Sequence, residues 1–111
     1  MIPVCPLVDL PPGSAVRVEG GAGSGTPLAV FNADGELYSL DDTCTHQDAS
    51  LADGYLEDCW IECPLHASSF DLRTGRPNGP PAKRPVRTHQ VTVRDGMVYV
   101  IPSPAAAPVA S

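Results

Sequence analysis

CTHQDASLADGYLEDCWIECPLH, residues 44–66, contains two short motifs, Cys44-x-His46 and Cys63-x-x-His66, separated by sixteen residues. Each motif offers one thiolate and one imidazole. A single structural zinc ion usually takes two cysteines from one turn and two histidines at wider spacing from a helix. The mixed pairing instead favours two metals side by side, one bound by both sulfurs and the other by both nitrogens. This is the ligand set of a [2Fe-2S] centre in which two histidines replace two cysteines on one iron.

The neighbouring residues extend this pattern. Residues 40–81, LDDTCTHQDASLADGYLEDCWIECPLHASSFDLRTGRPNGPP, resemble the cluster-binding region of Rieske proteins. From about residue 2 to residue 101, the chain is similar to the small Rieske ferredoxins of bacterial aromatic-ring dioxygenase systems. The resemblance implies one Rieske-type [2Fe-2S] cluster per chain. Its ligands would be Cys44, His46, Cys63 and His66.

The same resemblance implies which residues surround the cluster. Pro80 and Pro81 would belong to a stiff loop that covers it, and Ser68 would donate a hydrogen bond to a cluster sulfur. High-potential relatives carry a tyrosine where this chain has Phe70, and two bridging cysteines where it has Ala49 and Leu65. With fewer donors and an acidic environment, we expect a potential near the lower end of the Rieske range, roughly −150 to +300 mV.

Short apolar runs separated by Gly and Pro predict an all-β Rieske fold, with a small antiparallel sandwich or barrel as its base. Two hairpins are expected around Asp34-Gly35 and Asp95-Gly96. Residues 1–101 are interpreted as one domain, residues 41–81 as an inserted cluster-binding subdomain, and residues 102–111 as a disordered Pro/Ala-rich tail. The expected strands are Leu28–Asn32 and Glu36–Leu40, His89–Arg94 and Met97–Ile101, Ala15–Glu19, Asp58–Cys63 and Ser69–Arg73.

The net charge is −6, which argues against nucleic acid as a partner. Between Asp41 and Leu72 lie eight acidic residues and no Lys or Arg, whereas six of the seven basic residues follow from Arg73 onward. This acidic segment could be an ordinary solvated surface, or it could steer the chain onto basic patches of redox partners. Both interpretations stay open at this point.

Several residues outside the ligand set have an assigned role. Cys5 is interpreted as an N-terminal strand residue and Cys59 as a buried or half-buried strand thiol, while His89 is more typical of a structural than a functional histidine. Apolar residues near the ligand motifs, Leu51, Leu65 and Ala67, are candidates for a contact patch with partners, although packing beneath the loops explains Leu65 at least as well.

No signal-peptide pattern and no membrane-length apolar run are present, so we expect a cytoplasmic monomer. The resemblance implies a one-electron carrier between an NAD(P)H-dependent flavoprotein reductase and a terminal oxygenase, and not an enzyme by itself. The chain cannot be the oxygenase, because a mononuclear iron site needs two further histidines and a carboxylate, and only His89 remains. Alternatives are a Rieske-like small subunit of a nitrite-reductase-type enzyme and a zinc-binding module.

Overall fold

The computed structural model describes residues 2–19, 27–43, 49–64, 69–79 and 85–102. These residues form strands and two single turns of 3-10 helix, and no α-helix occurs among them, which confirms the all-β prediction. In chain order the elements are β1 (Ile2–Pro6), η1 (Leu7–Asp9), β2 (Ala15–Val18), β3 (Leu28–Ala33), β4 (Glu36–Asp41), η2 (Leu51–Asp53), β5 (Tyr55–Glu57), β6 (Trp60–Glu62), β7 (Ser69–Asp71), β8 (Thr88–Arg94) and β9 (Met97–Ile101).

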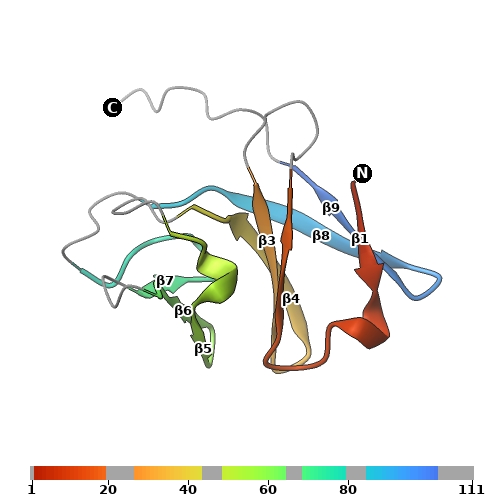
Figure 1. The fold of residues 1–111 in the computed structure, drawn as a ribbon, viewed down its shortest axis with the longest axis horizontal. Helices are drawn as coiled ribbons and strands as arrows, with labels where there is room; N and C mark the ends of the chain where they lie inside the picture. Colours follow the sequence, from red (N-terminus) through yellow and green to blue (C-terminus); the bar gives the residue numbers. More distant parts are fainter. Residues whose placement is uncertain (1, 20–26, 44–48, 65–68, 80–84, 103–111) are drawn as a thin grey trace.

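Two antiparallel sheets make up the fold (Figure 1). The larger has six strands in the order β1-β9-β8-β4-β3-β2, and the smaller has three in the order β5-β6-β7. The small sheet is inserted between β4 and β8, which pair directly through Ser39 and His89. An insertion into an antiparallel base is the expected arrangement. The boundaries of the domain at 1–101 and of the subdomain at 41–81 stay predictions, and the expected tail falls largely outside the described residues.

Strand β3 lies between two hydrophobic cores, and all six of its residues are buried. Leu28 and Val30 pack with Val98 and Val100 of β9 in the core of the base. Because successive strand residues point to opposite faces, the alternate residues of β3 enter a second core. That second core joins the base to the small sheet through Ala29, Phe31, Leu40, Leu51, Ile61, Cys63, Phe70 and Leu72. The packing of β3 therefore fixes the position of the small sheet.

The hairpin turns explain where the strands begin and end. Asp34 and Gly35 have φ of 55° and 97°, and Asp95 and Gly96 have φ of 52° and 78°. Positive φ at both central residues gives the two-residue turn whose twist matches paired strands. A further turn at Asp58, with φ of 54°, separates β5 from β6. The expected strand Asp58–Cys63 was therefore too long, and sequence analysis missed β5.

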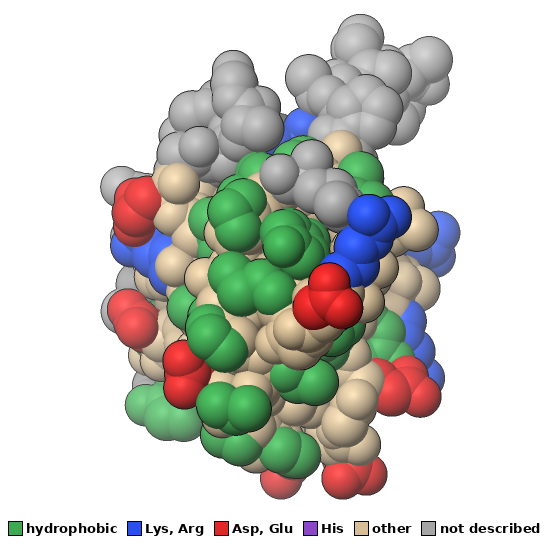
Figure 2. All heavy atoms as spheres, turned by 90° about the vertical axis from the view of Figure 1, so that its right-hand side faces the viewer, with side chains coloured by type: hydrophobic (Ala, Val, Ile, Leu, Met, Phe, Trp, Pro, Cys, Tyr) green, Lys and Arg blue, Asp and Glu red, His purple; other side chains and the backbone are tan. Residues whose placement is uncertain are grey.

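The face opposite the small sheet is apolar (Figure 2). Hydrophobic side chains run down its middle, and most of the charged groups lie toward its edges. Large apolar side chains exposed on η1, β8 and β9 are Leu7, Val8, Val93 and Ile101. In the described part of the chain, no helix has the length and apolar character needed to cross a lipid bilayer.

Candidate metal centre

Strand β6 leads directly into Cys63, whose side chain is completely buried in the core between the two sheets. Of the four expected ligands, the structure describes only this one, because Cys44, His46 and His66 lie outside the described residues. For the same reason, no group of three or more potential metal ligands occurs within the described ranges. The four-residue ligand set therefore stays a prediction, as do the roles of Ser68, Pro80 and Pro81.

Both ligand segments are closed at their base by strand-like pairing. An isolated antiparallel bridge joins Thr43 to Ser50, on either side of the first segment. Glu62 pairs with Ser69 across β6 and β7, on either side of the second. The described residues on either side of each segment are thus held together by the sheet framework, and this framework rests on the packed core.

Asp42 ties the two ends of the first loop together, a role that sequence analysis missed. Its carboxylate is buried and accepts a hydrogen bond of 2.9 Å from the backbone N–H of Ala52, while its carbonyl accepts one of 2.7 Å from Leu51. Arg17 Nε lies 3.5 Å from the second carboxylate oxygen. Nothing in the sequence distinguishes Asp42 from the neighbouring acids, because its contacts with η2 and with Arg17 of β2 form only in the folded chain.

The expected proline loop begins beside the second ligand loop. Asn78 donates its backbone N–H to the Ser69 carbonyl at 2.8 Å and accepts the Ser69 N–H on Oδ1 at 3.2 Å. After the segment that contains Pro80 and Pro81, Val86 donates to the Gly75 carbonyl at 2.9 Å. The segment is therefore anchored at Ser69, at the base of the second ligand loop, and at Gly75, in the turn after β7. Its role as a cover of the cluster stays a prediction.

Asp41, Arg87 and His89 form a polar cluster where β4 meets β8. Asp41 lies 2.8 Å from His89 Nε2 and 3.2 Å from Arg87 Nε. Burial alone would raise the pKa of Asp41, but hydrogen bonds from His89 and Arg87 and the Arg87 charge hold it below its ordinary value. His89 has a fully buried side chain, and its contact with Asp41 supports the structural interpretation.

Asp41→Asn is expected to lower the free energy of unfolding by about 2 kcal/mol at neutral pH, because the charged hydrogen bonds of Asp41 with Arg87 and His89 are weakened. The folded-state pKa of Asp41 is lowered, so its contribution is complete above the unfolded value of 3.8 and is lost as pH falls through the folded value. Urea unfolding between about pH 7 and pH 3 would show that the free energy of unfolding falls less with acidification in Asp41→Asn than in wild type. Asp53→Asn, at an exposed position, is the control. An equal loss of unfolding free energy on acidification in Asp41→Asn and wild type would contradict the stabilising role of the Asp41 carboxylate.

The acidic segment is less uniformly negative than its sequence indicates. Asp41 and Asp42 have arginine partners, and Arg73 makes a two-pronged contact with Asp71 at 2.9 and 3.1 Å. The hydrogen bond from Arg73 lowers the pKa of Asp71. Glu57, by contrast, is exposed and takes part in no ion pair with the described residues. Among the described residues, the charge of Glu57 on β5 is therefore not balanced by an ion pair.

The structure corrects two expectations about side chains near the loops. Leu51 is fully buried beneath the first loop, so its assignment to a partner contact patch was wrong. Cys59 is half-buried, as expected, but it lies in the β5–β6 turn and not in a strand. Cys5 lies in β1 as expected, and burial raises the pKa of its thiol. Leu65 and Ala67, the other contact candidates, are outside the described residues.

The described surroundings fit a metal-bound sulfur. Cys63 is in no disulfide and is buried at a strand end, where a thiolate would be stable only beside a cation. The Ser50 hydroxyl, at the base of the first loop, is buried and hydrogen-bonds to none of the described residues. A buried unpaired hydroxyl is costly, which fits a loop that closes around a group with acceptor atoms. The donor types, cysteine with histidine, suit a Rieske cluster.

Comparison with known proteins agrees with this chemistry. The sequence profile of the Rieske [2Fe-2S] domain family matches residues 1–90. A 3-phenylpropionate/cinnamic acid dioxygenase ferredoxin subunit from Photorhabdus laumondii is 46% identical, with 87% of this chain and 90% of that protein covered. A chain in the complex of reduced oxygenase and oxidized ferredoxin in carbazole 1,9a-dioxygenase matches with a TM-score of 0.81 and 39% identity, over 89% of this chain and 90% of that one.

A more distant neighbour shares the fold alone. A small subunit of an NADPH nitrite reductase matches with a TM-score of 0.73 at 24% identity, over 90% of this chain and 96% of that chain. At this identity the likeness carries no argument about function.

Proposed function

Because the chain belongs to the Rieske [2Fe-2S] domain family, we propose that it is the ferredoxin of an aromatic-ring dioxygenase system. It would carry single electrons from an NAD(P)H-dependent flavoprotein reductase to a terminal Rieske non-haem iron oxygenase. One observation carries the proposal. The Photorhabdus relative, named as a dioxygenase ferredoxin subunit, matches over nearly the full length of both chains. The chain itself would transform no metabolite.

In this proposal Cys44 and Cys63 would bind one iron, and His46 and His66 would bind the other. The cluster, when bound, supplies a one-electron redox couple. The protein keeps the Cys63 sulfur away from water in the core and fixes both ligand loops at their bases through Thr43, Ser50, Glu62 and Ser69. Neutral imidazoles add no negative charge, so accepting an electron is easier than in a four-cysteine centre.

Phe70→Tyr is expected to raise the reduction potential by roughly a tenth of the Rieske span of about −150 to +300 mV. Phe70 is buried in the same core as Cys63, and the resemblance places a sulfur-directed hydroxyl at its position. Protein-film voltammetry of the two proteins measures the shift. Phe31→Tyr, which buries a hydroxyl in that core from β3, is the control. Equal potentials in Phe70→Tyr and wild type would mean that the ring does not face the cluster.

The function is tested on the purified full chain. Analysis should find two irons and two acid-labile sulfides per chain, as a Rieske centre requires, and the dithionite-reduced protein should give the EPR spectrum of nitrogen-ligated iron. Reduction by NADH should then need a flavoprotein reductase, and reoxidation should be fastest with a terminal oxygenase. One zinc ion and no sulfide would instead support the zinc-binding alternative.

The alternative of a nitrite-reductase-type small subunit has weaker support. Such Rieske-like subunits often lack the ligands, whereas this chain has all four at the expected spacing. We include a cytoplasmic location in the proposal, because the nicotinamide that the reductase would consume is a cytoplasmic metabolite, and a monomeric state. Size-exclusion chromatography with light scattering would measure the latter.

A further inference from the structure

The outer face of the small sheet has an ordered arrangement of aromatic and acidic side chains. Tyr55 of β5 pairs with Glu62 of β6, and Glu57 of β5 pairs with Trp60 of β6. Directly paired residues point to the same side of a sheet. The opposite side of the small sheet carries the buried residues Ile61 of β6 and Phe70 of β7, which pair with each other. Aromatic rings and carboxylates therefore alternate both along and across the two strands, on the side away from the core.

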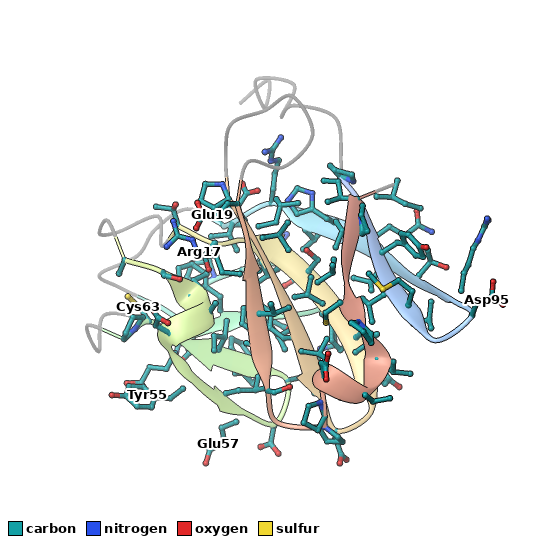
Figure 3. The ribbon with its side chains drawn as sticks, turned by 45° about the vertical axis from the view of Figure 1, so that its right-hand side comes forward. Arg17, Glu19, Tyr55, Glu57, Cys63 and Asp95 are labelled. Atoms are coloured by element: carbon teal, nitrogen blue, oxygen red, sulfur yellow. The ribbon has the colours of Figure 1, made fainter. Side chains whose placement is uncertain are left out.

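This outer face is accessible and hollowed. Tyr55 is 55% exposed, Glu57 is exposed and Trp60 is half-exposed. A surface hollow of about 320 Å³ is lined by Tyr55, Leu56, Glu57, Trp60, Glu62 and Ser69. In Figure 3 the Tyr55 and Glu57 side chains project away from the base, and Cys63 lies toward the same end of the small sheet as Tyr55.

The chemistry of this face selects a cation. The faces of Tyr and Trp rings attract a guanidinium or ammonium group, and flanking carboxylates add charge-assisted hydrogen bonds. A planar guanidinium can satisfy both, because it stacks on rings and pairs with carboxylates. Glu57 has no counter-ion among the described residues, so an incoming basic side chain would displace no internal partner from it. Tyr and Trp are also the residues that most often dominate interface energies.

The position of the face ties it to electron transfer. Glu62 immediately precedes Cys63, so a protein bound at this hollow lies against the strand that leads into the second ligand loop. The geometry points to the outer face of β5 and β6 as a docking site for an arginine or lysine on the surface of the terminal oxygenase. This inference rests on the proposed function. It assigns the docking contacts to Tyr55, Glu57, Trp60 and Glu62, in place of the incorrectly predicted Leu51.

The single tryptophan of the chain makes the site observable, because Trp60 lies within it. The holoprotein is titrated at low salt with the terminal oxygenase of the Photorhabdus 3-phenylpropionate/cinnamic acid dioxygenase, and Trp60 emission is followed. Wild type should show a changed emission on binding. Glu57→Lys should raise the dissociation constant of the complex about tenfold. Tyr55→Leu, which keeps the bulk of the side chain but removes the ring, should raise it about threefold.

Asp9→Lys is the matched control, with the same charge change on an exposed residue of η1 in the base. It should bind as wild type does. Equal weakening by Glu57→Lys and Asp9→Lys, unchanged Trp60 emission in a complex that forms, or no complex with this oxygenase would each overturn the inference. Weakened binding to the reductase alone would overturn the assignment to the oxygenase.

Iron content and the EPR spectrum of the reduced protein, measured on the same preparations, separate a failure of the docking site from a failure of the proposed carrier function. A normal cluster in a protein that docks elsewhere refutes only the docking site. A preparation without a cluster refutes the carrier itself.

Discussion

Cys63→Ser is expected to leave the purified chain colourless, with iron and acid-labile sulfide close to zero and no EPR signal after reduction. Cys63 is the one expected ligand whose surroundings the structure describes, and its thiol is buried at the end of β6. A serine hydroxyl is a far poorer ligand for iron at neutral pH because it stays protonated. Since both irons belong to one cluster, loss of one cysteine removes both.

Two other cysteines provide matched controls. Cys5 in β1 and Cys59 in the β5–β6 turn are free and half-buried, and neither has an assigned ligand role. Cys5→Ser and Cys59→Ser should keep wild-type iron content and spectrum. If Cys63→Ser retained a full cluster of unchanged potential, the ligand assignment would be wrong. If Cys59→Ser lost the cluster, the turn thiol would have to replace one of the assigned cysteines.

Gly54→Ala is expected to lower the free energy of unfolding by about 3 kcal/mol or more and to reduce iron content. Gly54 lies between η2 and β5, and a methyl group there would overlap the backbone carbonyl oxygen of Glu62. Neither backbone can yield easily, because Gly54 also donates its N–H to the Leu51 carbonyl at 2.9 Å. The displaced Glu62 immediately precedes Cys63, so the strain reaches the second ligand loop.

Urea unfolding and iron analysis measure both effects. Gly13→Ala is the comparison, because Gly13 has φ of +88° and open space where a methyl group would lie. It should cost only about 1 kcal/mol, from backbone conformation, with normal iron content. Similar losses of stability and iron in the two variants would show that the contact with Glu62 is unimportant.

The sequence predicts the base sheet well because its signals are local. The Asp-Gly turns at Asp34-Gly35 and Asp95-Gly96 adopt the positive φ that such pairs favour, and the strands on either side follow. Strand β5 was missed because three residues, Tyr55–Glu57, are too few to show a period. Its hydrogen bonds to β6 come from tertiary pairing.

The candidate site, like the sheets, combines features that local sequence signals predict with features that depend on tertiary contacts. The Cys/His spacing indicates the ligand set from sequence alone, whereas Asp42 and Gly54 act through contacts that only the folded chain reveals. Leu51 was assigned to the surface because it lies near a ligand motif in sequence, yet the turn of η2 directs it into the core. Proximity along the chain does not determine which side of a loop a residue faces.

Membership of β3 in both cores links the stability of the cluster-bearing sheet to that of the whole fold. Separating the small sheet from Phe31, or the outer strands from Val30, would expose apolar side chains that are otherwise inaccessible to water. Partial opening is therefore costly, and the amide protons of β3 should exchange with solvent only when the entire chain unfolds. A protein cycled repeatedly between donor and acceptor would thus keep its framework throughout its working life.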